Sequence, residues 1–181
     1  MSNKKINDMI KKDKVCILIA DGGFFKDEDV TKSAKRLLGK IPLEDYENVR
    51  IVRPLGEYGK SNGIGRDFYA DFVFDNLFEI KAIYIEDLVY CSTDEVERKI
   101  FVALMSLFGI EVYDDYDCGV VDPDPVYCGE IARVFHNNMD MPECILEATD
   151  EQLFEIKCIA VAILRQMWAE YRFLDCMKAT E

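Results

Sequence analysis

The chain has 181 residues, of which 50% are hydrophobic, and a formal net charge of −13 at pH 7. This length can bury one substantial core with an appended segment, and the negative charge disfavours autonomous binding to DNA or RNA, whose phosphates are held mainly by Lys and Arg. No C-x-x-C pair occurs among the 7 cysteines, which argues against a zinc site. No apolar run reaches the roughly 18 residues of a membrane span and no secretory pattern opens the chain, so we expect a cytoplasmic protein.

Residues 1–13 are lysine-rich and are predicted to form a solvated basic arm. After this arm, short apolar runs rich in β-branched residues alternate with helical patterns. The runs span residues 14–20, 48–54, 80–86 and 110–115. Such an alternation is typical of a three-layer α/β domain with a parallel sheet, which we assign to residues 14–120.

Capping patterns indicate where two of the helices begin. Ser92 and Glu95 have capping-box spacing ahead of an apolar helical stretch, and Thr149 and Gln152 repeat that spacing before a helix predicted to run to about Met177. Between these helices, the sequence CGVVDPDPVYCG contains prolines and glycines that a helix interior does not tolerate. We therefore place the edge of the sheet domain there and assign residues 121–181 to a helical extension.

A glycine-rich loop, GEYGKSNGIGRDF, separates the second run from the next helical pattern at residues 56–68. It contains Gly-Lys-Ser, but a phosphate-binding P-loop needs four residues between its first glycine and that tripeptide. Only Glu57 and Tyr58 separate Gly56 from Gly59. The loop is therefore interpreted as a strand-to-helix connection and not as a nucleotide cradle.

Ligands of an open parallel sheet bind beyond the carboxyl ends of its strands, so the residues directly after each run are candidates for a site. The acidic residues at these positions are Asp21, Glu86, Asp87, Asp114 and Asp115, and all of them except Asp114 are candidate metal ligands. Mg²⁺ is satisfied by one or two carboxylates plus water, so one hypothesis is an Mg²⁺-dependent enzyme of phosphoryl transfer or phosphoester hydrolysis. In that hypothesis, Lys60 or Arg66 of the glycine-rich loop faces the substrate phosphate.

Three segments resemble the catalytic domain of serine recombinases, the resolvase/invertase family, over about residues 14–117. ILIADGGF (17–24) resembles the family's Tyr-x-Arg-x-Ser segment, and GKSNGIGRDF (59–68) resembles its Ser-Gly and Arg-Pro loop. The stretch at 82–115, AIYIEDLVYCSTDEVERKIFVALMSLFGIEVYDD, resembles its strand, helix and next strand, with Glu86 matching the family's aspartate. The resemblance implies a resolvase-like fold.

The chemistry of that family is missing from the matched positions. The nucleophilic serine falls on Gly23, its companion arginine falls on Asp21, and two further arginines become Asp87 and Tyr90. Glycine has no atom with which to attack a phosphodiester, and a carboxylate in place of an arginine repels the phosphate. The remnant of the phosphate-binding set is Lys60, Ser61 and Arg66. This comparison implies a pseudoenzyme without a cofactor, and the Mg²⁺ enzyme remains the alternative.

The long C-terminal helix carries apolar residues at steps of three and four. Those expected at an interface are Leu153, Ile156, Ile163, Met167, Trp168 and Tyr171. This periodicity is equally consistent with packing on the chain's own sheet and with packing on a partner, but the wide apolar face suggests two neighbours. In the resembled family such a helix mediates dimerisation, which implies a homodimer or a protein partner. The charge also fits an acidic protein that binds the basic surface of a nucleic-acid enzyme.

Overall fold

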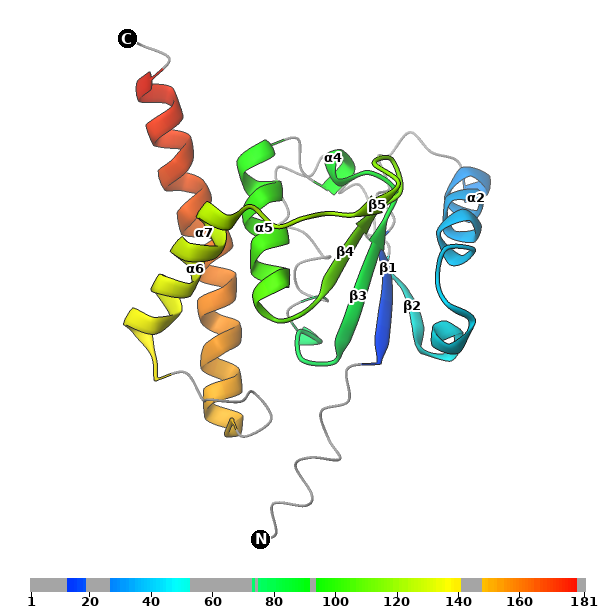
Figure 1. The fold of residues 1–181 in the computed structure, drawn as a ribbon, viewed down its shortest axis with the longest axis horizontal. Coiled ribbons are helices and arrows are strands. Elements are labelled where there is room, and N and C mark those ends of the chain that lie inside the picture. Colours follow the sequence, from blue (N-terminus) through cyan, green and yellow to red (C-terminus); the bar gives the residue numbers. More distant parts are fainter. Residues whose placement is uncertain are drawn as a thin grey trace, which may run out of the picture.

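The computed structural model describes residues 13–18, 27–52, 73, 75–91, 94–140 and 148–178. These residues form an α/β domain in which a five-stranded sheet is flanked by helices on both faces (Figure 1). In the sheet order β2-β1-β3-β4-β5, the strands are β1 Lys14–Leu18, β2 Val49–Val52, β3 Ile80–Ile85, β4 Glu111–Asp114 and β5 Gly119–Val120. The four strands predicted from the apolar runs are confirmed.

The prediction of a purely parallel sheet is wrong at one edge. β1, β2, β3 and β4 are parallel, whereas β5 runs antiparallel to β4 and pairs Val120 with Tyr113. The turn that joins β4 to β5 is short, and a short turn can connect only antiparallel strands. Cys118, in this turn, has a φ of 57°, a left-handed conformation that lets the chain reverse.

The described helices follow the expected alternation after β1 and β3, with two additions and one corrected cap, whereas the helix expected between β2 and β3 lies mostly outside the described residues. They are α2 Asp27–Leu38, the 3₁₀ helix η1 Leu43–Asn48, α4 Leu88–Cys91, α5 Glu95–Leu107, α6 Pro125–Asn138 and α7 Asp150–Lys178. The short η1 and α4 were not predicted. The cap of α5 is Asp94 rather than Ser92, because Asp94 directly precedes the first helical residue and accepts hydrogen bonds from the Val96 and Glu97 amides at 3.0 and 3.2 Å.

The capping box of α7 is confirmed. The Thr149 amide donates to Gln152 Oε1 at 2.9 Å, and the Gln152 amide donates to Thr149 Oγ1 at 3.2 Å. These two bonds satisfy amide groups that the helix itself leaves without partners, so α7 has a defined start.

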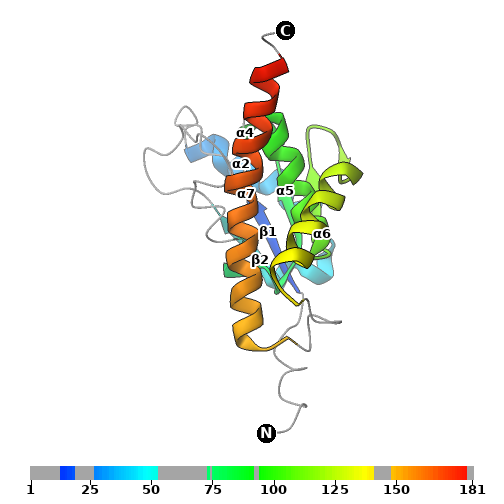
Figure 2. The ribbon, with the colours of Figure 1, turned by 90° about the vertical axis from the view of Figure 1, so that its left-hand side faces the viewer.

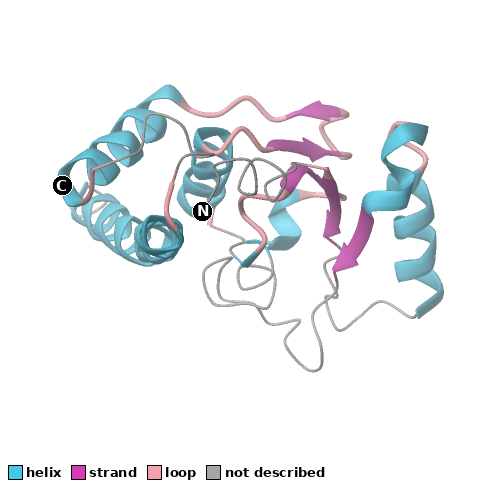
Figure 3. Ribbon diagram, turned by 90° about the horizontal axis from the view of Figure 1, so that it is seen from below, coloured by secondary structure: helices cyan, strands magenta, loops and turns pink. Residues whose placement is uncertain are grey.

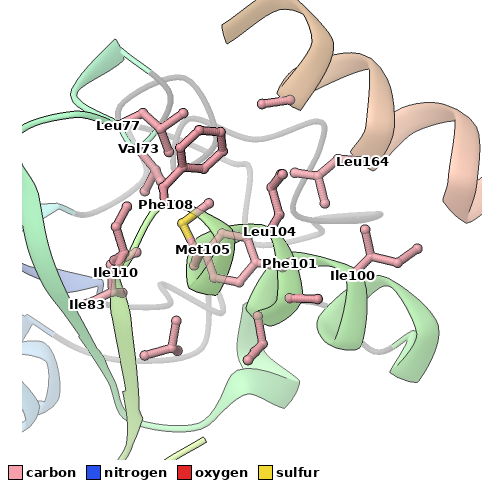
Figure 4. Packing of buried hydrophobic residues seen from close by; sticks show 14 of the residues in the cluster. Val73, Leu77, Ile83, Ile100, Phe101, Leu104, Met105, Phe108, Ile110 and Leu164 are labelled. Atoms are coloured by element: carbon pink, nitrogen blue, oxygen red, sulfur yellow. The ribbon is translucent and has the colours of Figure 1, made fainter. Parts of the chain in front are cut away.

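The main core lies between the sheet and three helices. α5 packs on the sheet, and α6 and α7 pack on α5 from outside (Figures 1 and 2). Phe108 connects these layers, because its ring meets those of Phe78 and Phe135 edge to face, with centroids 6.0 and 5.8 Å apart. Leu104 and Leu164 extend the contact between α5 and α7 (Figure 4). The predicted extension thus shares one core with the sheet.

Helices lie on both faces of the sheet (Figure 3), and a smaller hydrophobic cluster fills the space between the sheet and α2. Val15 of β1 packs there with Leu37 and Ile41, whereas the next residue, Cys16, lies in the main core. This alternation is expected for a strand that is covered on both sides. α2 therefore closes the second face near β1, and the side chain of Arg36, in its last turn, reaches residues that follow β3 and β4.

No helix in the described part of the chain is long and apolar enough to cross a membrane.

Candidate functional site

The carboxyl ends of β3 and β4 bring two of the predicted acidic residues together. Backbone pairing continues beyond both strands, with the Asp115 amide 3.0 Å from the Ile85 carbonyl oxygen and the Tyr116 amide 3.0 Å from the Glu86 carbonyl oxygen. Glu86 and Asp115 consequently occupy adjacent positions at the same edge of the sheet. Their side chains are 30% and 10% exposed, so both carboxylates remain in partial contact with solvent.

A cation from α2 lies between these two carboxylates. Arg36 Nη2 donates to Glu86 Oε1 at 2.6 Å, and Arg36 Nε lies 2.6 Å from Asp115 Oδ2. Lys40 Nζ is a more distant neighbour, 3.9 Å from Asp115 Oδ1. From the sequence, only Lys60 and Arg66 were expected as cations near these carboxylates. Arg36 was missed because it is 50 residues from Glu86 in the chain.

The pKa of the Arg36 guanidinium reflects this environment. Desolvation lowers it, but the hydrogen bonds and negative charges of Glu86 and Asp115 more than offset that effect, so the pKa lies above its usual value. The arginine therefore stays charged at every physiological pH. Chemically, this arrangement is a charge-neutralising link between α2 and the sheet, because each carboxylate has a guanidinium nitrogen at hydrogen-bonding distance.

Two neighbouring aspartates are engaged with backbone amides. Asp114, 3% exposed, accepts hydrogen bonds from the Leu88 amide at 3.0 Å and the Tyr116 amide at 2.9 Å. Asp87 accepts one from the Val89 amide at 2.8 Å. The two carboxylates thus hold the start of α4 and the turn after β4. From the sequence, Asp87 was expected to be a metal ligand, whereas Asp114 was placed at this edge of the sheet without a role.

The remaining predicted positions are only partly placed. Asp21, Gly23, Lys60, Ser61 and Arg66 lie outside the described residues. Tyr90 lies on α4, but its side chain is outside the described part. Within the described part of the chain, no three His, Cys, Asp or Glu side chains are grouped so that they could hold a metal ion.

A buried thiol lies in the sheet below this edge. Cys16 is fully buried, and desolvation raises its pKa to about 12 in spite of the nearby charges of Lys14 and Arg50. Since the thiolate is the nucleophilic form, Cys16 is a core residue and not a catalytic one.

Comparison of the chain with models of protein families, with curated proteins and with solved structures finds no match.

We expect Mg²⁺ and Mn²⁺ to leave the thermal unfolding of the protein unchanged beyond charge screening, because Arg36 already neutralises Glu86 and Asp115. A metal that bound only the native state would add about 2.7 kcal/mol at a hundredfold excess over its Kd. The measurement is a melting series against each ion, with Ca²⁺ at matched ionic strength as the control. A saturable, Mg²⁺-selective rise that disappears in Asp87→Ala would favour the phosphoryl-chemistry hypothesis.

Replacing Arg36 by glutamine should lower the free energy of unfolding by about 1 kcal/mol, because one exposed cation serving two carboxylates is at the upper end of surface ion pairs. The loss should shrink as salt is added, since screening weakens the same pairs in the parent. Urea unfolding at low and high salt checks this. The control is Arg133→Gln, which removes only an exposed pair with Glu130 one helical turn away. Equal effects of the two variants would show that Arg36 has no special role.

Proposed function

We propose that this protein is a catalytically inactive resolvase-like domain that acts by association, through the second half of α7. The proposal is supported by the segment that resembles serine recombinases most closely, 82–115, which forms β3, α5 and β4 in sequence. The long helix after the sheet is a second point of support, because in the resembled family that helix mediates dimerisation.

The absence of catalysis in this proposal follows from what replaces the reactive groups. A recombinase site needs a nucleophile and arginines that face a phosphate. In this chain, Gly23 stands where the family has its nucleophile, and Asp87 stands where it has an arginine. A carboxylate cannot donate a hydrogen bond to a phosphate, and that of Asp87 accepts one from the Val89 amide. The nearby guanidinium of Arg36 is bound by two carboxylates of the same chain.

The length of α7, 29 residues from Asp150 to Lys178, is the observation that carries the proposal. Ile156, Ala160, Ile163 and Leu164, in the first half of the helix, are buried in the main core. Residues 165–178 continue for about 21 Å, and the last turns extend past α5 and α6 (Figures 1 and 2). This second half still carries Met167, Trp168 and Tyr171.

Of the residues expected at an interface from the sequence, those in the first half of α7 pack inside the domain instead. Ile156 and Ile163 are 0% and 2% exposed inside the domain, and Leu153 packs against the same cluster. Met167, Trp168 and Tyr171 remain candidates for an interface, because their apolar side chains recur at steps of three and four along the helix. A second copy of the chain is the partner that we favour, and a different protein is the alternative.

Sedimentation of the full chain over a range of concentrations tests the proposal. We expect a dimer that shifts to monomer in Trp168→Glu and in Tyr171→Glu, one turn further along α7. The control is Phe154→Glu, which adds the same charge at a side chain that is 70% exposed in the first half of the helix. Urea unfolding of each variant shows whether the domain remains folded. A parent protein that stays monomeric at the highest concentration would exclude self-association and leave a different protein as the partner.

A further inference from the structure

A groove separate from the site of Glu86, Asp115 and Arg36 lies beside the first two turns of α5. Its volume is ≈500 Å³, within the roughly 300–1,000 Å³ typical of small-molecule sites. One wall is α5, and the other is the segment 121–125, which leads from β5 into α6. Since α4 and α5 follow β3 directly, the groove opens near the carboxyl ends of the strands, where ligands of α/β proteins bind.

The floor of the groove is apolar. Leu88 and Val102 line it and are 7% and 5% exposed, and Val121 packs against the same core cluster. Pro123 and Pro125 lie on the wall opposite α5, and their fixed φ angles make that wall stiff. The groove is therefore largely preformed, so a ligand would lose little affinity to reorganisation of the protein.

The two walls carry opposite charges. Arg98 and Lys99 lie on α5, and Lys99 pairs with Glu95 on the same helix at 2.7 Å. Asp122 and Asp124 lie on the facing segment, where Asp124 also accepts the Val126 amide at 2.9 Å. Within the described part of the chain, Asp122 forms no ion pair.

The charges of the two walls influence each other across the groove. The pKa of Lys99 is raised, first by its hydrogen bond to Glu95 and by the charge of that residue, and to a smaller extent by Asp124. Three acidic residues and two basic residues line the groove, in a chain whose net charge is −13. A cation therefore gains from the acidic wall and from the field of the whole protein.

We propose that this groove binds a small amphipathic amine, with its apolar body on Leu88, Val102 and Val121 and its ammonium group beside Asp122. A carboxylate in that position would meet repulsion from Asp122 and Asp124. A cation beside Lys99 would be repelled as well, so the two walls fix the orientation of the ligand. This proposal is independent of association through α7.

The test uses three ligands of similar shape and different charge: tryptamine, its neutral alcohol analogue tryptophol, and the anion indole-3-acetate. Titration of the ¹⁵N-labelled full chain should give saturable amide shifts at residues 88, 95–102 and 121–125, with a Kd of about 1 mM for tryptamine, as expected for so few ligand atoms. Tryptophol should bind about threefold more weakly and indole-3-acetate about tenfold more weakly, because one exposed charge contact contributes a modest factor.

Two exposed substitutions should change tryptamine affinity in opposite directions. Asp122→Asn should weaken it about threefold and leave tryptophol unchanged, whereas Lys99→Gln should strengthen it by a similar factor. Asp140→Asn, an exposed acidic residue outside the groove, is the control for net charge and should have no effect. Structural damage would weaken tryptamine binding in both groove variants. Affinity changes of opposite direction in the two variants would therefore identify an electrostatic role of these side chains.

The proposal is overturned by any of three results. One is the absence of saturable shifts, or shifts that map outside the groove. The second is equal affinity for tryptamine and tryptophol, which would remove the role of the acidic wall. The third is tightest binding by indole-3-acetate, which would assign the ligand's charged group to Arg98 and Lys99.

Discussion

Replacing Ile163 by alanine should lower the free energy of unfolding by about 2–5 kcal/mol, the usual cost of removing a buried aliphatic side chain. Ile163 is 2% exposed and belongs to the cluster that joins α7 to α5 and the sheet. The alanine would leave a cavity in a region where aromatic rings restrict collapse. Urea unfolding measured at several protein concentrations gives both the size of the loss and its origin.

The concentration series distinguishes the domain core from an interface between chains. If Ile163 packs within one chain, the difference between variant and parent stays the same at every concentration, whereas a contact between two copies would couple stability to concentration. Phe154→Ala, at a side chain that is 70% exposed on the same helix, should change stability by no more than about 0.5 kcal/mol. A concentration-dependent loss for Ile163→Ala would place the first half of α7 in the interface.

Replacing Asp114 by alanine should lower the free energy of unfolding by about 2–4 kcal/mol, because two amides lose a charged acceptor in a site with little access to water. The carboxylate is 3% exposed and accepts from the Leu88 and Tyr116 amides. Urea unfolding measures the loss. Hydrogen exchange at Leu88 and Tyr116 shows whether α4 and the turn after β4 open locally.

Two further substitutions test whether the buried carboxylate causes this loss of stability. Asp114→Asn keeps one acceptor oxygen and should lose about half as much stability, since its amino group cannot accept the second hydrogen bond. Asp117→Ala changes an exposed aspartate of the same turn and should stay within about 0.5 kcal/mol of the parent. If Asp114→Ala and Asp117→Ala behaved alike, the buried carboxylate would not be what holds this edge of the sheet.

Local patterns predicted the elements whose signal is complete within a few residues. The four parallel strands are short apolar runs, and the start of α7 is encoded by Thr149 and Gln152 alone. β5 was missed because two residues, Gly119 and Val120, are too short to show a period of two. The cap of α5 was misplaced because Ser92 and Asp94 are both good capping residues, and the choice depends on where the preceding α4 ends.

The edge of the sheet was predictable only in part. Parallel strands place their carboxyl ends together, so Glu86 and Asp115 were expected at the same edge of the sheet, but their position on adjacent strands follows from the strand order of the structure. The cation between them was not expected, because Arg36 belongs to a helix on the opposite face from α5 and no spacing rule relates it to Glu86, 50 residues away. Asp114 is a mixed case, because its bond to the Tyr116 amide is local, whereas the Leu88 amide, 26 residues away, comes close only when β3 and β4 pair.

By itself, the sequence determined where the four parallel strands lie and where α7 begins, because each depends on residue type and short-range spacing. Only the tertiary structure decided that Arg36 neutralises the acidic edge, that the first half of α7 belongs to the core, and that a groove forms beside α5. These features join residues far apart in the chain. Their energies depend on distance and burial, which a one-dimensional pattern does not contain.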